Sequence, residues 1–216
     1  MSGSNQRHDS KTKLLDAALN VIRTKGYAAT RIEDICEVAG LTKGSFFHHF
    51  KSKEDLALAA VEYWAEGTGA FFCSAPYRSL PDPLDRLLAY VDFRKSILQG
   101  DLSEFTCLAG TMIQEIYETN PAIREACNKS ISDHAATLEP DIEEAIRKYG
   151  VEGSWTAESL ALYTQAVIQG AFILAKAKHE TGVAASCIDH LHKYLELLFN
   201  QSKSAKEIPA SRLSTR

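Results

Sequence analysis

Apolar residues recur at the spacing of one helical face in almost every segment of the chain. In the first such segment, from about residue 9 to residue 25, they follow the pattern i, i+3, i+4, i+7, i+8: Leu14, Ala17, Ala18, Val21 and Ile22. The six prolines lie between periodic segments, and no alternating strand pattern persists. The pattern predicts an all-α protein of about nine helices.

Two short helices are expected directly after the first. One begins at Thr30, whose hydroxyl can cap it, with Glu33 three residues later to complete a capping box, and ends at Gly40. The next begins at Thr42 and ends near Phe50. Glycine readily adopts the left-handed backbone that a tight connection needs, so this pair has the geometry of a helix-turn-helix.

The remaining periodic segments predict a fourth helix capped by Ser52 and five longer helices. The longer ones are expected at about 83–99, 103–118, 121–148, 156–179 and 184–200. The predicted organisation is a disordered N-terminus (1–8), a helix-turn-helix domain (9–55), a larger helical domain (56–200) and a polar, Ser/Lys-rich disordered tail (201–216).

Composition narrows the class of protein. No segment approaches the roughly 18 consecutive apolar residues of a membrane-spanning helix, and the N-terminal residues lack the apolar core of a signal peptide. We therefore expect a cytoplasmic protein with no membrane partner. The net charge is −4, but residues 1–55 carry nine Lys/Arg against seven Asp/Glu, and the remainder fifteen against twenty-one. This asymmetry permits a DNA-binding head on an acidic body without establishing one.

The cysteines and histidines form no recognisable framework. The five cysteines include no C-x-x-C pair, which argues against a zinc site, and their odd number and wide spacing argue against a disulfide scaffold. The pairs His48-His49 and His190-x-His192 have no carboxylate or cysteine at ligand spacing. We expect reduced thiols, no metal and no cofactor.

The segment 42–50 has the properties of a recognition helix. Such a helix exposes small polar or cationic groups at its N-terminal end and buries a hydrophobic face that fixes it on its neighbours. The first requirement is met by Thr42, Lys43, Gly44 and Ser45, and the second by Leu41, Phe46 and Phe50. Lys43 can donate to guanine acceptors, and Thr42 or Ser45 can reach a base or a phosphate.

Charged residues at neighbouring helix starts extend the same surface. Lys51 and Lys53, and likewise Thr30 and Arg31, are placed to meet the phosphate backbone. Each has a purely structural explanation as well, since threonines at these positions cap helices and lysines near helix ends are usually just solvated. Their joint placement around one helix pair favours DNA binding.

The run TRIEDICEVAGLTKGSFFHHFKSKEDL, residues 30–56, resembles the signature of the TetR family of transcriptional regulators. The resemblance covers about residues 10–60, and the rest agrees only in helix number and length. It implies an N-terminal three-helix DNA-binding domain and a C-terminal ligand-binding and dimerisation domain. It further implies a regulator, usually a repressor, that binds double-stranded operator DNA as a homodimer and is released by a small-molecule effector.

The resemblance also implies individual DNA contacts. Thr30 and Arg31 would hold phosphate or an adjacent base, and His49 and Lys53 would clamp the backbone. The family usually has tyrosine where this chain has Phe47, so a hydroxyl contact to phosphate is lost there. The full expected set is Thr30, Arg31, Thr42, Lys43, Gly44, Ser45, Phe47, His48, His49 and Lys53.

The last two predicted helices resemble the family's two-helix dimer face. Small residues in 156–179 let helices approach closely. The expected interface is Ala166, Gly170, Ala171, Leu191, Leu195 and Leu198. Both helices could instead be core of the monomer, but a helix-turn-helix normally needs two half-sites about one DNA turn apart, which favours the dimer.

Aromatic and sulfur-containing residues are candidates for an effector pocket, although each could equally fill the core. They are Trp64, Phe93, Cys107, Met112, Tyr117, His134, Tyr163 and Phe172. Cys107, placed in the first turn of a helix where free amides favour negatively charged sulfur, is the most specific candidate. Its segment is similar to one in the electrophile-responsive repressors of the family, where a cysteine senses reactive carbonyls or oxidants. The alternative is a buried free cysteine.

A different class of function is a helical enzyme or carrier with an incidental helix-turn-helix. The sequence contains no G-x-S-x-G, no H-E-x-x-H and no phosphate-binding glycine loop, so enzymatic activity is not expected. Salt-dependent binding to promoter DNA separates the two hypotheses. The pattern does not distinguish a repressor from an activator.

Overall fold

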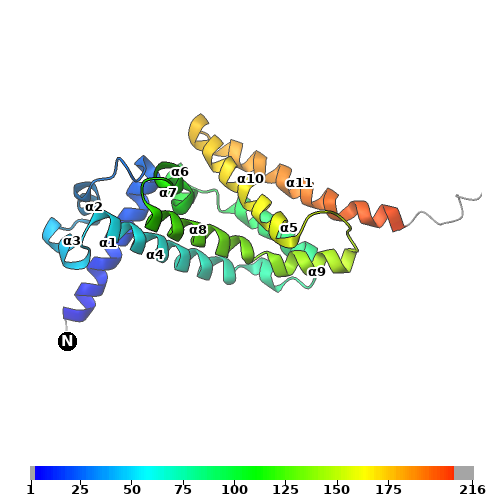
Figure 1. Ribbon diagram of the computed structural model, residues 1–216, viewed down its shortest axis with the longest axis horizontal. Coiled ribbons are helices and arrows are strands. Elements are labelled where there is room, and N and C mark those ends of the chain that lie inside the picture. Colours follow the sequence, from blue (N-terminus) through cyan, green and yellow to red (C-terminus); the bar gives the residue numbers. More distant parts are fainter. Residues whose placement is uncertain (1–2, 207–216) are drawn as a thin grey trace, which may run out of the picture. The chain divides into compact units, whose positions relative to one another are not determined.

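The computed structural model describes the backbone of residues 3–206 and the side chains of residues 10–199. This part of the chain contains helices and no strands, as predicted. The N-terminal helices are α1 (Gly3–Lys25), α2 (Ile32–Ala39) and α3 (Lys43–His49), drawn in blue and cyan in Figure 1. The helices that follow are α4 (Lys53–Cys73), the short 3-10 helix η1 (Pro76–Ser79), α5 (Pro83–Ser96), α6 (Leu102–Phe105), α7 (Leu108–Ile116), α8 (Pro121–Ala136), α9 (Glu139–Tyr149), α10 (Ala157–Lys178) and α11 (Thr181–Lys206).

Two of the about nine predicted helices are each divided in two in the described residues. The segment 103–118 is interrupted because Thr106 and Cys107 are extended, with ψ of 153° and 128°. The segment 121–148 is interrupted because Pro140 lies in the first turn of α9, where its missing N–H is tolerated.

The chain ends also differ from the prediction. Residues 3–8 and 201–206, which were predicted to be disordered, are helical and extend α1 and α11. The other residues of the predicted disordered ends, 1–2 and 207–216, lie outside the described part.

The chain forms two compact units. The first consists of residues up to Ser74 together with Gln99–His134, and the second of Ala75–Leu98 together with the residues from Ala135 onward. In this division α4, α6 and α7 group with the helix-turn-helix, whereas the sequence analysis placed the domain boundary between residues 55 and 56.

The core of the first unit joins α1 to the helix-turn-helix. All five apolar positions of the predicted α1 stripe are buried, and they pack with Ile35, Phe46 and Leu56. Gly40 ends α2 with a left-handed φ of 65°, and the N–H of Leu41 donates to the carbonyl of Cys36 at 2.9 Å. The two-residue connection thus closes as the sequence predicted.

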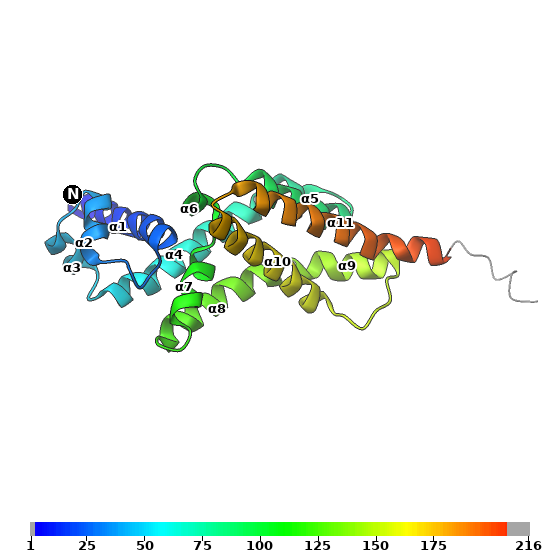
Figure 2. The same ribbon diagram turned by 90° about the horizontal axis from the view of Figure 1, so that it is seen from above.

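The second unit is built around the pair α10 and α11, which contact each other and diverge away from their connection in both ribbon views (Figures 1 and 2). They pack on α5 and α9. By length and composition alone, α10 is the one helix in the described residues that could cross a membrane, with a mean hydropathy of 1.3. A helix in the core of a folded domain has the same composition, and α10 is partly buried here.

Candidate nucleic-acid interface

Helix α3 presents polar groups at its N-terminal end and is anchored by aromatic rings beneath. The hydroxyl of Thr42, the N-cap, accepts a hydrogen bond from the N–H of Ser45 at 3.2 Å. Thr42, Lys43 and Gly44 are exposed, whereas Phe46 and Phe50 are buried. This division between the two faces agrees with the predicted recognition helix.

Ion pairs arrange the charges around α2 and α3. Lys43 pairs with Glu33 of α2, and this hydrogen bond is the main reason that the pKa of Glu33 is lowered. The pKa of Asp34 is lowered to about 2, first by its hydrogen bond from Lys25 and then by the backbone N–H of Arg31. Most of the Arg31 side chain remains exposed.

The start of α2 corrects one sequence prediction. Its N-cap is Arg31 rather than Thr30, and Asp34 rather than Glu33 closes the capping box. Thr30 is buried, 1% exposed, and its hydroxyl donates to the carbonyl of Gly26 at 2.6 Å. Its side chain is therefore not available to hold a phosphate, and we remove it from the expected set.

The side chain of Lys53 also binds groups within the protein. Its Nζ donates to the carbonyls of Tyr27 and Thr30, both at 3.0 Å, and lies 4.4 Å from the centre of the Tyr27 ring. In this arrangement the ammonium group holds the α1–α2 turn, so a direct backbone clamp by Lys53 is not supported.

The C-terminal half of α3 carries the other expected contacts. Phe47 is 56% exposed and meets Phe46 edge-on, with ring centroids 5.2 Å apart. His48 is exposed, and Nε2 of the half-buried His49 lies 2.7 Å from Oγ of Ser10. The Phe47 ring is exposed one helical turn after Lys43, so it is accessible to a nucleic acid.

Comparison with known protein families identifies the family of this chain. Residues 14–60 match the family model described as bacterial regulatory proteins, tetR family. Residues 83–189 match the model of the C-terminal domain of LmrA/YxaF-like transcriptional regulators. The chain belongs to the TetR family of transcriptional regulators.

Individual TetR-family proteins are similar over most of the chain. The HTH-type transcriptional regulator LmrA of Bacillus subtilis is 28% identical, over 86% of this chain and 97% of its own. A TetR regulator from Chloroflexus aurantiacus has a TM-score of 0.76 at 26% identity, covering 89% of this chain and 96% of that chain. The fold is also shared with CifR, solved as a cysteine mutant complexed with 26 bp double-strand operator DNA, at a TM-score of 0.71 and 15% identity, over 84% and 94% of the two chains.

The expected dimer residues are only partly at the surface of the second unit. Ala171, Leu191 and Leu195 are buried in its core, at most 2% exposed, so their assignment to an interface is wrong. Ala166 is exposed, and Gly170 and Leu198 are partly exposed.

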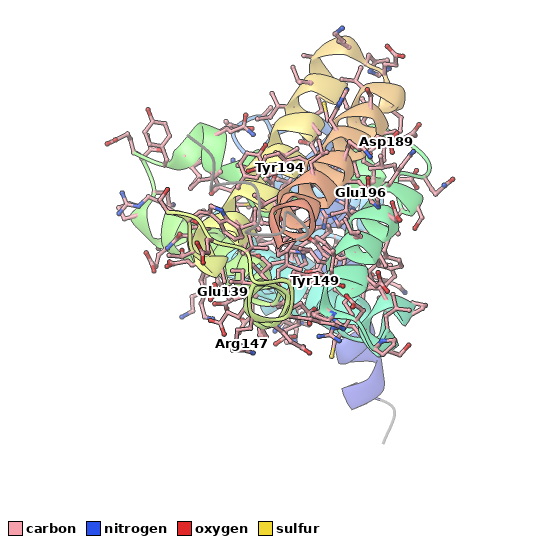
Figure 3. All side chains as sticks on the ribbon, turned by 90° about the vertical axis from the view of Figure 1, so that its right-hand side faces the viewer. Glu139, Arg147, Tyr149, Asp189, Tyr194 and Glu196 are labelled. Carbon is pink, nitrogen blue, oxygen red and sulfur yellow. The ribbon has the colours of Figure 1, made fainter. Side chains whose placement is uncertain are left out.

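A different set of apolar side chains is exposed on the same two helices. Its members are large, each between 43% and 51% exposed: Leu162, Tyr163, Ile173, Leu174, Tyr194 and Leu197. The rings of Tyr163 and Tyr194 lie 5.1 Å apart and join α10 to α11 at this surface, and Figure 3 labels Tyr194 there. We call this set the α10–α11 apolar face. The spacing of 162, 166 and 173 on one helix stripe was a signal that the sequence analysis did not use.

Within the first unit, the expected pocket residues have separate surroundings. The Arg23 guanidinium lies 4.9 Å from the ring centre of Trp64, and Met112 is core. His134 meets Phe72 edge-on at 4.7 Å. Tyr117 is 54% exposed and lines a hollow of about 360 Å³ that none of the other expected pocket residues lines.

Within the second unit, Phe93 lines an open hollow of about 400 Å³ with Tyr77 and Leu80. Phe172 is buried, and the guanidinium of Arg94 lies 5.6 Å from its ring centre. The interior also holds a hydrogen bond of 2.9 Å from the amide of Gln165 to the hydroxyl of Tyr90, with both side chains buried. The sequence analysis missed this polar pair, and it counted Tyr163 as pocket although that ring lies on the exposed α10–α11 apolar face.

Cys107 occupies the N-cap of α7 and is half-buried. Its Sγ accepts a hydrogen bond from the N–H of Gly110 at 3.3 Å. Arg23, distant in sequence, donates to the carbonyl of Glu104 at 3.0 Å and to that of Thr106 at 3.5 Å. Burial lowers the pKa of the Arg23 guanidinium, while charge on Cys107 and Glu104 opposes that shift. The structure therefore supplies the cationic neighbour of Cys107 that the local sequence lacks.

Proposed function

We propose that this TetR-family regulator is a repressor that binds operator DNA as a homodimer and is released by a small-molecule effector. The observation that carries the proposal is the division of α3 into an exposed polar N-terminal end and a buried aromatic anchor. A helix built in this way can lie in the major groove with Thr42, Lys43 and Gly44 toward base edges. Access to operator DNA would place this activity in the cytoplasm.

The α10–α11 apolar face supports the dimer. Large apolar side chains are rarely gathered at the surface of a monomer, and burying them between two copies removes them from water. A symmetric pair of helices from each copy would form a four-helix interface. Two copies would also present two α3 helices to two operator half-sites.

Cys107 supports a reactive carbonyl or an oxidant as the effector. The sulfur lies at the N-terminus of α7 and accepts a hydrogen bond from the N–H of Gly110, and Arg23 binds the carbonyl of the preceding residue, Thr106. The neighbouring Thr106 hydroxyl is buried, and none of the residues with described side chains makes a hydrogen bond to its oxygen. An adduct on Cys107 would remove the acceptor of the Gly110 N–H and disturb the first turn of α7.

Selection of DNA from a random pool by the full chain tests the proposal. We expect enrichment of a palindromic site whose half-sites are about one helical turn apart, bound by two chains with an affinity that falls as salt rises. An incidental helix-turn-helix on an enzyme or carrier would enrich no sequence. Enrichment of a single, non-symmetric half-site by one chain would contradict the dimer.

A further inference from the structure

The turn between α1 and α2 is held by two charged side chains from other helices. On one side, the N–H of Ala28 donates to Oε2 of Glu115 at 2.7 Å. On the other, Lys53 donates to the carbonyls of Tyr27 and Thr30. Both contacts lie within the first compact unit. Side chains from outside the turn thus supply hydrogen-bond partners for these backbone groups of the turn.

Glu115 lies at the unfavourable end of its own helix. It is in the last turn of α7, where the unpaired carbonyls carry partial negative charge, and that turn has no basic residue. A carboxylate at this place weakens rather than stabilises α7. Its hydrogen bond to the turn is a charge-assisted one, which is stronger than a neutral bond.

Gly26 allows this carboxylate to approach. Its φ is +86°, and a Cβ added there would overlap the carboxylate of Glu115. Glycine therefore meets two demands, the left-handed end of α1 and the space that Glu115 occupies.

Helix α7 is tied to α1 at its other end as well. Arg23, in the last turn of α1, donates to the carbonyls of Glu104 and Thr106, directly before Cys107. Contacts at both ends of a nine-residue helix fix it to α1 and to the α1–α2 turn. The turn leads directly into Arg31, the N-cap of α2.

We infer that Glu115 is a positioning residue that sets the α1–α2 turn, and with it Arg31 and α2, for operator binding. Glu115 makes this contribution without touching DNA. A displacement of α7 reaches the DNA-binding helices through its carboxylate. The inference rests on the proposed operator binding.

Hydrogen exchange of the DNA-free protein tests the contact itself. The variants are Glu115→Ala, Glu115→Gln, which keeps an acceptor oxygen, and the matched control Glu118→Ala, which removes the same charge from an exposed residue three positions later. We expect faster exchange in the peptide covering residues 26–31 for Glu115→Ala, a smaller change for Glu115→Gln, and none for Glu118→Ala. Unchanged exchange in Glu115→Ala overturns the inference.

Operator affinity tests the consequence, on DNA selected by the wild-type chain. Losing a hydrogen bond to a charged group should weaken binding about tenfold in Glu115→Ala, with partial recovery in Glu115→Gln and less than about a twofold change in Glu118→Ala. Equal affinities of Glu115→Ala and Glu118→Ala overturn the positioning role. A wild-type chain that enriches no DNA contradicts the proposed function instead, while the exchange data still decide the contact.

A second variant, Gly26→Ala, tests the same contact between Glu115 and the α1–α2 turn. Alone it should displace the carboxylate and weaken operator binding, and in the Glu115→Ala background its effect on DNA affinity should shrink, because the two changes remove one interaction. Thermal unfolding of each variant separates a specific effect on DNA affinity from a loss of folded protein. Additive effects on affinity in folded variants overturn the inference.

Discussion

Lys43, the first residue of α3, pairs its ammonium group with the carboxylate of Glu33 on α2. Both side chains are more than half exposed, and the pair joins the two helices of the helix-turn-helix at the surface proposed to meet DNA. In the proposed operator complex, Lys43 would therefore exchange a carboxylate for a base or phosphate acceptor. The Glu33 carboxylate holds the lysine in place but would also compete with DNA for its ammonium group.

Removing Lys43 and neutralising Glu33 should change operator affinity in opposite directions. Lys43→Ala should weaken specific binding about tenfold or more and leave the oligomeric state unchanged. Glu33→Gln should strengthen it about two- to fivefold at low salt, because a competing negative charge is removed. Glu37→Gln, the same change at another exposed position of α2, is the control in a fluorescence anisotropy titration. An equal gain in Glu33→Gln and Glu37→Gln would mean that net charge alone is responsible.

Phe47→Tyr should strengthen operator binding. The Phe47 ring is exposed on α3, so a hydroxyl added to it can donate to a phosphate without entering the core. One hydrogen bond is worth about 0.5–1.5 kcal/mol, which corresponds to roughly two- to tenfold in affinity. Phe47→Leu should not show this gain. Unchanged binding by Phe47→Tyr would place the ring away from the DNA backbone.

Leu174→Lys should dissociate the dimer. Leu174 lies on the α10–α11 apolar face and is 47% exposed in the single chain. A lysine there would bury an unpaired charge between two copies, which is costly. Phe71→Lys is the matched control, since Phe71 is also 47% exposed but lies on α4. Sedimentation should find monomers only for Leu174→Lys, and a dimeric Leu174→Lys would exclude this face.

Cys107→Ser should abolish the response to electrophiles, while Cys73→Ser, at an exposed cysteine on α4, should retain it. The serine oxygen can still accept from Gly110 but is a poor nucleophile at neutral pH. Operator release by methylglyoxal, followed by gel shift, measures the difference. Release of DNA from the Cys107→Ser variant at the wild-type concentration would exclude this thiol as the sensor.

Asp82→Asn should destabilise the second unit. Asp82 caps α5 through the N–H groups of Leu84 and Asp85 and accepts from Lys148 and from the hydroxyl of Tyr149 at 2.6 Å. Tyr149 is labelled on α9 in Figure 3. Asparagine keeps an oxygen for the cap but loses the charge that strengthens the bonds from Lys148 and Tyr149, so we expect a loss of about 1 kcal/mol in the free energy of unfolding, against little change in the control Asp85→Asn. An equal loss in both variants would contradict a stabilising role of the Asp82 charge.

The same carboxylate gives a pH dependence. Burial acts to raise the pKa of Asp82, but the hydrogen bonds from Lys148, Tyr149 and the backbone outweigh it, and the pKa is lowered from 3.8. The folded state holds the Asp82 carboxylate ionised. Its contribution to the free energy of unfolding is therefore complete above about pH 4 and is lost as pH falls below that value. Asp82→Asn should therefore lose less stability on acidification than the wild type.

Local signals in the sequence were sufficient for the helix-turn-helix. Gly40 ends α2, Thr42 caps α3 and the apolar periodicity of α1 fixes its buried face, so each of these elements was predicted from neighbouring residues. The start of α2 was misplaced by one residue because Thr30 and Arg31 each precede an acid by three residues, and the Thr30 hydroxyl instead donates to the carbonyl of Gly26.

Contacts between distant residues could not be predicted in this way. Arg23 reaches the carbonyls before Cys107 across more than eighty residues, and Lys53 turns back onto Tyr27. On α10 and α11, composition showed apolar helices but did not separate core residues such as Leu195 from exposed ones such as Leu197. That separation depends on which stripe faces α5 and α9.

The most direct measurement of the central claim is the dissociation constant of the full wild-type chain for its selected operator, with and without a panel of small molecules and thiol-reactive compounds. The proposed function predicts tight, salt-dependent binding by two chains and a rise of about tenfold or more in the dissociation constant with at least one compound. Sequence-specific binding that no compound weakens, or a folded dimer that binds no specific DNA, would contradict an effector-released repressor.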